Sequence, residues 1–321
     1  MRVLVAEAIA DDGLELLARE HDVEYRPGVS RDDLLALLPA YDALVVRSQV
    51  QVDAQALAVA HRLKVVGRAG VGVDNIDVVA ATAAGVLVVN APTANTVAAA
   101  ELTIGLLHAL VRNVTEADAS LRRGEWRRAE LLGHELRGRT LGIVGLGKIG
   151  LAVADRARAL EMRLIGNDPY VDIAVAASHG VAHVELEVLL REANVVTLHV
   201  PLNDATRRVI NAESLTLMKP DSYLINVARG GLVDEEALAA ALRDGRLAGA
   251  AIDVFENEPP TGSPLLDAPR TVLTPHLGAS TREAQTRAGT EVAEQVLDAL
   301  AGRRPLHAIN EPLARNTTLS A

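Results

Sequence analysis

The sequence contains no cysteine in its 321 residues. Disulfides, thiolate nucleophiles and cysteine-based metal sites are therefore excluded, and the lack of disulfides fits a reducing compartment such as the cytoplasm. The nine histidines show no mutual metal-ligand spacing, so we expect no metal. Aromatic residues make up only 2% of the chain, which leaves no stacking platform for single-stranded nucleic acid.

Positive charge is in deficit, because 32 basic side chains stand against 42 acidic ones and give a net charge of −10. A nucleic-acid-binding surface must be basic, so this balance argues against a nucleic-acid partner. No apolar run approaches the length of a membrane span, and the opening stretch "MRVLVAEAIADDG" acquires acids too early for a signal peptide. We therefore expect a cytoplasmic protein with no membrane partner. The length favours two domains.

Two series of short β-branched runs alternate with amphipathic segments rich in alanine and leucine. The first series predicts strands at 2–6, 42–47, 63–68 and 86–90, separated by helices near 11–20, 31–38, 53–60 and 74–84. The second predicts strands at 140–145, 162–168, 194–200, 222–228, 248–254 and 270–274. Such βα series are typical of parallel sheets covered on both faces, hence of an α/β fold.

The helices between and after these series indicate how the two bodies connect. Residues 93–121 are apolar on more than one face and predict one long buried helix. A last helix is expected to start at "STRE" (280–283), with Ser280 and Glu283 as a capping box. Its apolar face comprises Ala284, Ala288, Val292, Val296 and Leu300. If this helix returns to the first body, the second domain is an insertion in the first.

The stretch "LGIVGLGKIG" (141–150) has the spacing G-x-G-x-x-G at Gly145, Gly147 and Gly150. A strand precedes it, and a helix whose N-terminus can bind phosphate follows it. The next strand ends at Asp168, a carboxylate that can accept ribose hydroxyls and that repels the 2′-phosphate of NADP. The complete set predicts an NAD site.

An earlier glycine loop, "GRAGVGVDN" (67–75), has glycines at 67, 70 and 72 but none at the offset that the third glycine of the pattern needs, and no acid ends a following strand. Its run of N–H groups, with Arg68 nearby, could hold a substrate carboxylate. A glycine turn packed under a helix is an equally good interpretation.

Three charged residues follow strand ends in the second series: Arg229, Glu258 and His276. Ligands of open α/β sheets bind at the carboxyl ends of the strands, so these side chains can converge there. An arginine fork suits a substrate carboxylate, and histidine suits removal of a hydroxyl proton, supported by a neighbouring carboxylate. Singly, each is as well explained as a surface charge or a cap. Asp253 could contact the nicotinamide or serve a structural turn.

At these residues the chain resembles the D-2-hydroxyacid dehydrogenase family. The matching stretches are "VVRS", "GRAGVGVDNID", "ANTVAAAELTIGLL", "ELRGRTLGIVGLGKIG", "NVARGGLVDEEAL", "AIDVFENEPP" and "TPHLGAST". The resemblance implies that Arg229, Glu258 and His276 are catalytic. It implies NAD contacts at Gly145, Gly147, Lys148, Ile149, Gly150, Asp168, Val200, Val227, Ala228, Asp253, Gly278 and Ala279. It implies substrate contacts at Arg47, Ser48, Arg68, Gly70 and Asn95.

The fold implied is a Rossmann NAD-binding domain, residues 95–286, inserted into a flavodoxin-like substrate-binding domain, residues 1–94 and 287–321. Both are expected to be doubly wound parallel sheets. The family also implies a homodimer or homotetramer. The chain resembles short members without an appended regulatory domain, so we expect no allosteric inhibition by serine.

The activity implied is NAD-dependent oxidation of a small 2-hydroxy acid. The leading expectation for the substrate is 3-phospho-D-glycerate, which is oxidised to 3-phosphohydroxypyruvate in serine biosynthesis.

Two residues depart from the family pattern. Val200 stands where relatives often have threonine and can offer the cofactor only its backbone, and Val50 removes a polar substrate contact. A reductase of glyoxylate, hydroxypyruvate or another 2-keto acid is the first alternative. An NAD(H)-sensing corepressor-like protein is the second.

Overall fold

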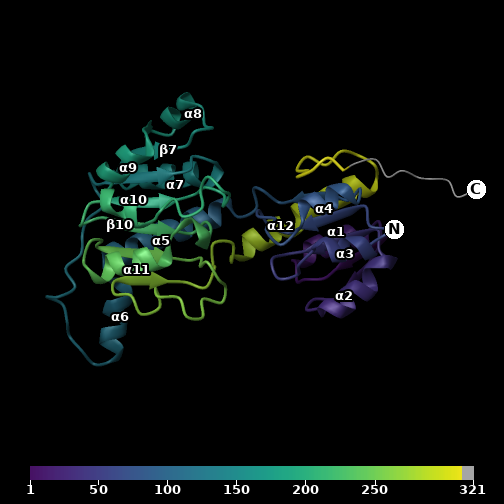
Figure 1. The fold of residues 1–321 in the computed structure, drawn as a ribbon, viewed down its shortest axis with the longest axis horizontal. Helices are drawn as coiled ribbons and strands as arrows, with labels where there is room; N and C mark the ends of the chain where they lie inside the picture. Colours follow the sequence, from purple (N-terminus) through teal and green to yellow (C-terminus); the bar gives the residue numbers. More distant parts are fainter. Residues whose placement is uncertain (313–321) are drawn as a thin grey trace, which may run out of the picture. The chain divides into compact units, whose positions relative to one another are not determined.

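The computed structural model describes residues 1–312, and residues 313–321, the end of the predicted segment 287–321, lie outside the described part. The chain divides into two compact units, one formed by residues 1–95 with the residues from Ala279 onward and one by Thr96–Gly278. Each unit is built on one sheet with helices along it (Figure 1). Every strand pairing in both sheets is parallel, which confirms the predicted α/β class.

The first unit has five strands in the order β2-β1-β3-β4-β5, the flavodoxin-like order. The strands are β1 (Arg2–Val5), β2 (Asp22–Tyr25), β3 (Ala43–Val46), β4 (Val65–Arg68) and β5 (Leu87–Asn90). The predictions did not include β2. Its sequence, DVEY, has no buried residue because the strand lies at the sheet edge, so it lacks the apolar run by which the others are found.

Helices cover both faces of this sheet. They are α1 (Asp11–Ala18), α2 (Arg31–Leu37), α3 (Ala54–Val59), α4 (Val78–Ala83) and α12 (Arg282–Leu300), with the short 3-10 turn η1 (Leu38–Ala40). The helices α1 and α12 pack on one face, and α2, α3 and α4 share a core with the other. The predicted apolar face of α12 is buried, as expected. Its cap differs from the prediction: Thr281, not Ser280, accepts the Ala284 N–H, so the helix begins one residue later than a Ser280 cap requires.

The second unit has seven strands in the order β12-β11-β10-β9-β6-β7-β8. The strands are β6 (Thr140–Val144), β7 (Arg163–Asn167), β8 (Val181–His183), β9 (Val195–Leu198), β10 (Tyr223–Asn226), β11 (Gly249–Ile252) and β12 (Thr271–Leu273). The order is that of a Rossmann sheet with one further strand. The chain turns from one side of β6 to the other, so the loops after β6 and β9 lie at the switch point where such sheets bind nucleotides.

Helices flank this sheet on both faces. They are α5 (Thr96–Val111), α6 (Val114–Arg122), α7 (Lys148–Ala159), α8 (Ile173–Ser178), α9 (Leu186–Glu192), α10 (Ala212–Leu217) and α11 (Glu235–Arg243), with the 3-10 turn η2 (Gly230–Leu232). One core contains residues of α5, α7 and α8, and the other contains residues of α9, α10 and α11.

The predicted single helix over residues 93–121 is wrong. The structure has two helices, α5 and α6, bent by 62°. Between them Asn113 adopts a left-handed backbone with φ 53°, a conformation that asparagine tolerates and that ends a helix. Within residues 1–312 no single helix has the length and apolar character to cross a membrane, although α5 and α6 pass that test as a bent pair.

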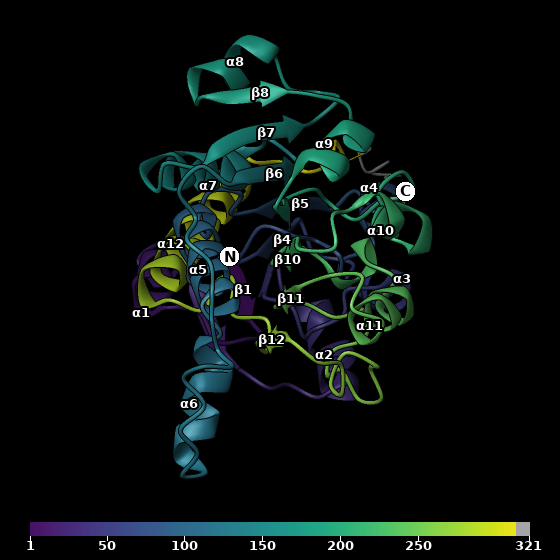
Figure 2. The same ribbon diagram turned by 90° about the vertical axis from the view of Figure 1, so that its left-hand side faces the viewer.

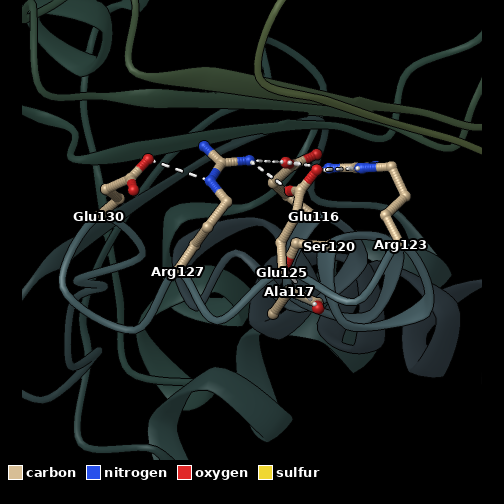
Figure 3. Close-up of polar contacts among 7 residues, drawn as sticks. All are labelled: Glu116, Ala117, Ser120, Arg123, Glu125, Arg127 and Glu130. Carbon is tan, nitrogen blue, oxygen red and sulfur yellow. Dashed lines mark hydrogen bonds and ion pairs between the residues drawn. The ribbon is translucent and has the colours of Figure 1, made fainter.

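The helix α6 extends beyond the sheet of its unit (Figure 2). Residues 123–130 fold back beside it through a network of ion pairs (Figure 3). Arg123 contacts Glu116 at 3.3 Å and Glu125 at 3.1 Å, and Arg127 contacts Glu116 and, at 3.0 Å, Glu130. We call residues 114–132 the arm. These ion pairs, with that of Arg122 to Asp118, engage three of the four arginines in the stretch "LRRGEWRR" (121–128).

Candidate active site

The three glycines of the 141–150 stretch have three different structural roles. Gly145 has φ 95°, and a Cβ there would lie 2.6 Å from the His199 carbonyl oxygen. A Cβ on Gly150 would lie 2.0 Å from the Gly145 carbonyl oxygen, so this glycine lets α7 approach the loop. A Cβ on Gly147 would meet nothing within 4 Å. The space above Gly147 is therefore open for a pyrophosphate to approach the backbone at the start of α7.

Asp168 follows β7 and faces this loop. Its Oδ2 accepts the Leu146 N–H at 2.9 Å, and its Oδ1 accepts the Tyr170 N–H at 2.9 Å. A carboxylate oxygen can accept more than one hydrogen bond, so both oxygens can still bind hydroxyls. The acceptor oxygens of Asp168 and the open backbone at Gly147 fit the adenosine and pyrophosphate parts of a dinucleotide.

The other predicted cofactor residues lie on or next to the loops that follow the strands of this sheet, and they differ in burial and contacts. Lys148 and Ile149 open α7, with Lys148 exposed and Ile149 packed against the core. Val200 lies against Gly145, whose added Cβ would be 2.8 Å from Val200 Cγ1. Val227 is buried against Gly278, and the Ala228 N–H is held by Asn226 at 3.1 Å. Ala279 is the first residue after this unit.

His199 directly follows β9, and its backbone lies against Gly145 of the nucleotide loop. Its N–H donates to the Val144 carbonyl at 2.7 Å, and its ring Nε2 lies 2.9 Å from Thr197 Oγ1. Burial lowers the pKa of His199 from 6.5 to about 3, so the ring is neutral in the folded protein near pH 7.

We predict that His199 makes the protein less stable in acid. The folded-state pKa is depressed, so below pH 6.5 the unfolded state binds more protons and stability falls as the pH drops toward about 3. Between pH 7 and pH 4.5 the wild type should lose on the order of 2 kcal/mol more than His199→Gln, whose amide does not titrate. Urea unfolding at the two pH values measures this difference. Equal losses in the two proteins would contradict it.

His276 and Glu258 form a hydrogen-bonded pair in the second unit. His276 Nδ1 lies 2.7 Å from Glu258 Oε2, and the other carboxylate oxygen accepts the Phe255 N–H at 3.2 Å. The side chains are 47% and 39% exposed, so a ligand can reach them. With Nδ1–H donating to the carboxylate, the tautomer leaves Nε2 with a lone pair that can accept a proton. The pair is arranged for acid–base chemistry.

Asp253 holds the backbone that carries His276. It is fully buried, and its carboxylate accepts hydrogen bonds from Thr274 Oγ1 at 2.6 Å, the Leu277 N–H at 2.7 Å and the Gly278 N–H at 2.9 Å. His276 itself has φ 54°, a strained conformation for a non-glycine residue, and its N–H donates to the Asp253 carbonyl at 2.8 Å. These contacts support the structural interpretation of Asp253. They do not support a contact with the nicotinamide, because both carboxylate oxygens are already engaged by this loop.

Arg229 lies on the loop after β10. The fully buried Asn226 fixes this loop, because its Nδ2 donates to the Arg229 carbonyl at 2.8 Å and its Oδ1 accepts the Ala228 N–H. The Arg229 Nη1 donates to the Ala228 carbonyl at 2.7 Å. A Cβ on the next residue, Gly230, would lie 1.9 Å from the Phe255 carbonyl carbon, so the loop of Arg229 and the loop leading to Glu258 are in close backbone contact. The strand ends thus bring all three predicted catalytic residues to one edge of one sheet.

The predicted substrate residues lie in the first unit, on the loops after β3 and β4. Arg47 is half-buried and Ser48 is exposed. Val50 is partly buried and packs against the hydrophobic core of the first unit. Arg68 ends β4 and Gly70 follows with φ 151°; a Cβ there would collide with the Arg68 guanidinium. Asn95 is the last residue of the unit before α5.

The two interpretations of the 67–75 loop apply to different glycines. A Cβ on Gly67 would lie 2.7 Å from Val296 and 2.8 Å from Val292, so this glycine serves packing of β4 under α12. In the part of the chain described, the N–H groups of Val71, Gly72 and Val73 have no hydrogen-bond partner. That segment retains the donors that an anion site needs.

Sequence reasoning missed several residues that shape these loops: Glu7, Asn75, Asn226, His199 and Gly230. A signal existed for three of them, since Asn226, Glu7 and His199 are polar residues at or just after the ends of apolar strands. For the others, the hydrogen bond or close contact becomes visible only in three dimensions. Within residues 1–312 no three His, Asp or Glu side chains gather as a metal site.

Comparisons with known proteins agree with this geometry. The family model for the D-isomer specific 2-hydroxyacid dehydrogenase, NAD binding domain, matches residues 104–278. A D-3-phosphoglycerate dehydrogenase from Methanocaldococcus jannaschii is 48% identical over 313 residues, which make up 97% of this chain. The chain spans 60% of the length of that relative.

Solved structures agree over the whole fold. The TT0316 protein from Thermus thermophilus has a TM-score of 0.89 and 39% identity, covering 97% of this chain and 100% of that one. A glyoxylate reductase from Paecilomyes thermophila has a TM-score of 0.88 and 32% identity, covering 96% and 98%. With the nucleotide loop and its NAD-binding domain, this chain belongs to the D-isomer specific 2-hydroxyacid dehydrogenase family.

Proposed function

We propose that the protein oxidises 3-phospho-D-glycerate to 3-phosphohydroxypyruvate with NAD, the first step of serine biosynthesis. The observation that carries the proposal is the His276–Glu258 pair, 2.7 Å apart at the edge of the sheet that holds the nucleotide loop. The M. jannaschii relative, named a D-3-phosphoglycerate dehydrogenase, supports the substrate. Because the chain spans only part of that relative, the activity and the substrate are both parts of the proposal.

In this proposal each residue has one role. NAD bound at Gly145–Gly150 supplies the acceptor for the hydride that leaves C2 of the substrate. His276 Nε2 accepts the hydroxyl proton, and Glu258 stabilises the resulting imidazolium through Nδ1. Arg229 binds the substrate carboxylate and polarises the forming carbonyl. Residues 96–278 act as the NAD-binding domain, and the first unit contributes Arg47, Ser48, Arg68, Gly70 and Asn95 to substrate binding.

The direct test is formation of NADH from NAD and 3-phospho-D-glycerate, with the keto acid identified as product. A second candidate, reduction of glyoxylate or hydroxypyruvate, is favoured by the similarity to the glyoxylate reductase and by Val50, which offers no polar contact. If hydroxypyruvate is reduced well and 3-phospho-D-glycerate is not oxidised, the second candidate replaces the first.

We predict that Asp168 selects NAD over NADP. Its carboxylate faces the loop at Leu146 and would repel a 2′-phosphate. Asp168→Ser should lower the preference for NAD, expressed as the ratio of kcat/KM values, by roughly 10- to 100-fold. Asp172→Ser is the matched control, because among the described contacts the Asp172 side chain only caps α8. An unchanged ratio in Asp168→Ser would assign the selectivity to other residues.

We also propose that the cytoplasmic protein is at least a homodimer that uses the arm. Val114, Leu121, Trp126 and Leu132 are 51% to 88% exposed, an unusual set of apolar side chains on a surface segment that ion pairs hold in shape. Light scattering should report a dimer or tetramer for the wild type and a monomer for Trp126→Asp combined with Leu132→Asp. Ile173→Asp, which alters an exposed apolar residue on α8, should leave the mass unchanged. A monomeric wild type would contradict the proposal.

A further inference from the structure

The loop Arg47–Val50 is held by two buried side chains from other parts of the first unit. Glu7, just after β1, is 7% exposed. Its Oε2 accepts the N–H groups of Arg47 at 2.7 Å and Val50 at 3.1 Å, and its Oε1 accepts that of Gln49 at 3.1 Å. Asn75, 8% exposed, donates through Nδ2 to the carbonyls of Arg47 at 2.9 Å and Val50 at 2.7 Å.

The two side chains divide the polar groups of the loop between them. Glu7 receives three N–H groups, and Asn75 supplies donors to two carbonyls. A carboxylate buried to this degree is costly unless hydrogen bonds compensate its charge, and three backbone donors do so. Neither side chain can therefore be removed without leaving buried backbone groups of this loop without a partner.

This arrangement resembles a backbone anion-binding site, with the Glu7 carboxylate in the place of a bound anion. Successive backbone N–H groups in a turn form a concavity that binds phosphates and carboxylates. Here the Glu7 carboxylate already fills that position. What the loop can still present to a substrate anion is the Arg47 and Ser48 side chains and the N–H of Ser48, which is not among the three that Glu7 accepts. The Arg47 guanidinium itself makes a long contact of 3.5 Å to the Ala8 carbonyl, next to Glu7.

The neighbouring loop, residues 67–75, offers backbone N–H donors. The N–H groups of Val71, Gly72 and Val73 have no partner within the described residues, as noted above. Asn75, at the end of the loop 67–75, ties that loop to Arg47–Val50. Its side chain donates to the carbonyls of Arg47 and Val50, and its backbone carbonyl accepts the Val52 N–H at 2.8 Å. One loop thus offers a guanidinium and a hydroxyl, and the other offers backbone donors, at a separation that Asn75 helps to fix.

We propose that Glu7 and Asn75 are positioning residues for substrate binding: they fix Arg47–Val50 so that this loop recognises an anionic group chiefly through the Arg47 side chain. The proposal rests on the proposed function, because that function makes Arg47 a substrate residue. It adds two residues that contact no substrate themselves and act through the loop.

The test compares Glu7→Gln with Asp42→Asn. Asp42 is also a buried carboxylate of the first unit, 6% exposed, whose Oδ2 accepts the Arg2 N–H at 2.9 Å. It directly precedes β3, however, and so lies at the amino end of that strand, whereas Arg47–Val50 follow its carboxyl end. Glu7→Gln places an NH2 group against N–H donors and should release the loop. The expected result is a KM for 3-phospho-D-glycerate raised roughly tenfold, with kcat and the KM for NAD within about twofold of wild type. Asp42→Asn should lower the thermal midpoint without changing either KM.

Hydrogen–deuterium exchange gives a readout that does not depend on activity. Peptides covering residues 47–50 should exchange faster in Glu7→Gln and not in Asp42→Asn. If Glu7→Gln fails to fold, Asn75→Ser, which shortens the side chain and removes the carbonyl contacts, should give the same faster exchange and the same raised KM.

The outcomes separate this proposal from the proposed function. Unchanged exchange, or faster exchange with an unchanged KM for the acid, would overturn the positioning role. A rise in the KM of Asp42→Asn equal to that of Glu7→Gln would show that general destabilisation explains the effect, and would overturn it as well. A wild-type protein that is inactive with every acid tested would overturn the proposed function, and the exchange of residues 47–50 would still decide whether Glu7 holds the loop.

Discussion

Replacing His276 with asparagine is expected to lower kcat by roughly 10²- to 10⁴-fold, the range that removal of a general base produces. Asparagine keeps a polar side chain of similar reach at Nδ1 but cannot accept the hydroxyl proton that Nε2 accepts in the proposal. Binding of NAD should change little, since the nucleotide loop at Gly145–Gly150 is a separate element. Steady-state kinetics and NADH titration measure the two effects.

A second histidine–carboxylate pair in the same unit provides the control. His179 Nδ1 lies 2.9 Å from Asp155 Oδ1, between the end of α8 and α7, so His179→Asn breaks a comparable pair at a distance from the loops after the strands. It should retain wild-type kcat. If His276→Asn also retains wild-type kcat, His276 is not the base and another group must accept the hydroxyl proton.

The second large effect is expected for Arg229→Lys. A guanidinium binds a carboxylate through two parallel hydrogen bonds, and a lysine ammonium cannot reproduce that geometry. Asn226 and the close contact at Gly230 hold the Arg229 backbone, so a shorter reach cannot be recovered by moving the loop. We expect kcat/KM for the hydroxy acid to fall by roughly 10²- to 10³-fold, mostly through KM, with the KM for NAD within about twofold.

The matched control is Arg243→Lys, because Arg243 is exposed on α11 and donates only to the Pro264 carbonyl among the contacts described. Its kinetics should equal those of the wild type. If Arg229→Lys raised the KM for NAD as much as the KM for the acid and also lowered the thermal midpoint, Arg229 would have a structural role instead.

The fold was largely predictable from the sequence because buried parallel strands are continuous apolar runs. "LVV" and "IVG" segments can be recognised without partners, whereas β2 (DVEY) and β8 (VAH), both at sheet edges, contain no such apolar run and were not predicted. The break at Asn113 was missed since composition reports the burial of α5 but not the left-handed residue after it. The same limit applies to the cap at Thr281, where two adjacent residues could each have capped the helix.

The candidate site was predictable where suitable residue types stand at a known sequence spacing. It was not predictable where the role of a residue depends on its hydrogen bonds in the folded chain. Gly145, Gly147 and Gly150 have the expected spacing, and the structure gives each a distinct steric reason. Asp253 and Glu7 illustrate the other case. Both are buried carboxylates that organise a loop through three hydrogen bonds, and a sequence does not tell such an acid from one that contacts a ligand.

The measurement that tests the account most directly is a comparison of kcat/KM for 3-phospho-D-glycerate, D-glycerate, hydroxypyruvate and glyoxylate, each in its own direction and with both NAD and NADP forms of the cofactor. The account predicts the highest value among the oxidations for 3-phospho-D-glycerate with NAD, and loss of that activity in His276→Asn. It would be contradicted if 3-phospho-D-glycerate were not oxidised while an unphosphorylated keto acid was reduced efficiently, or if activity survived in His276→Asn.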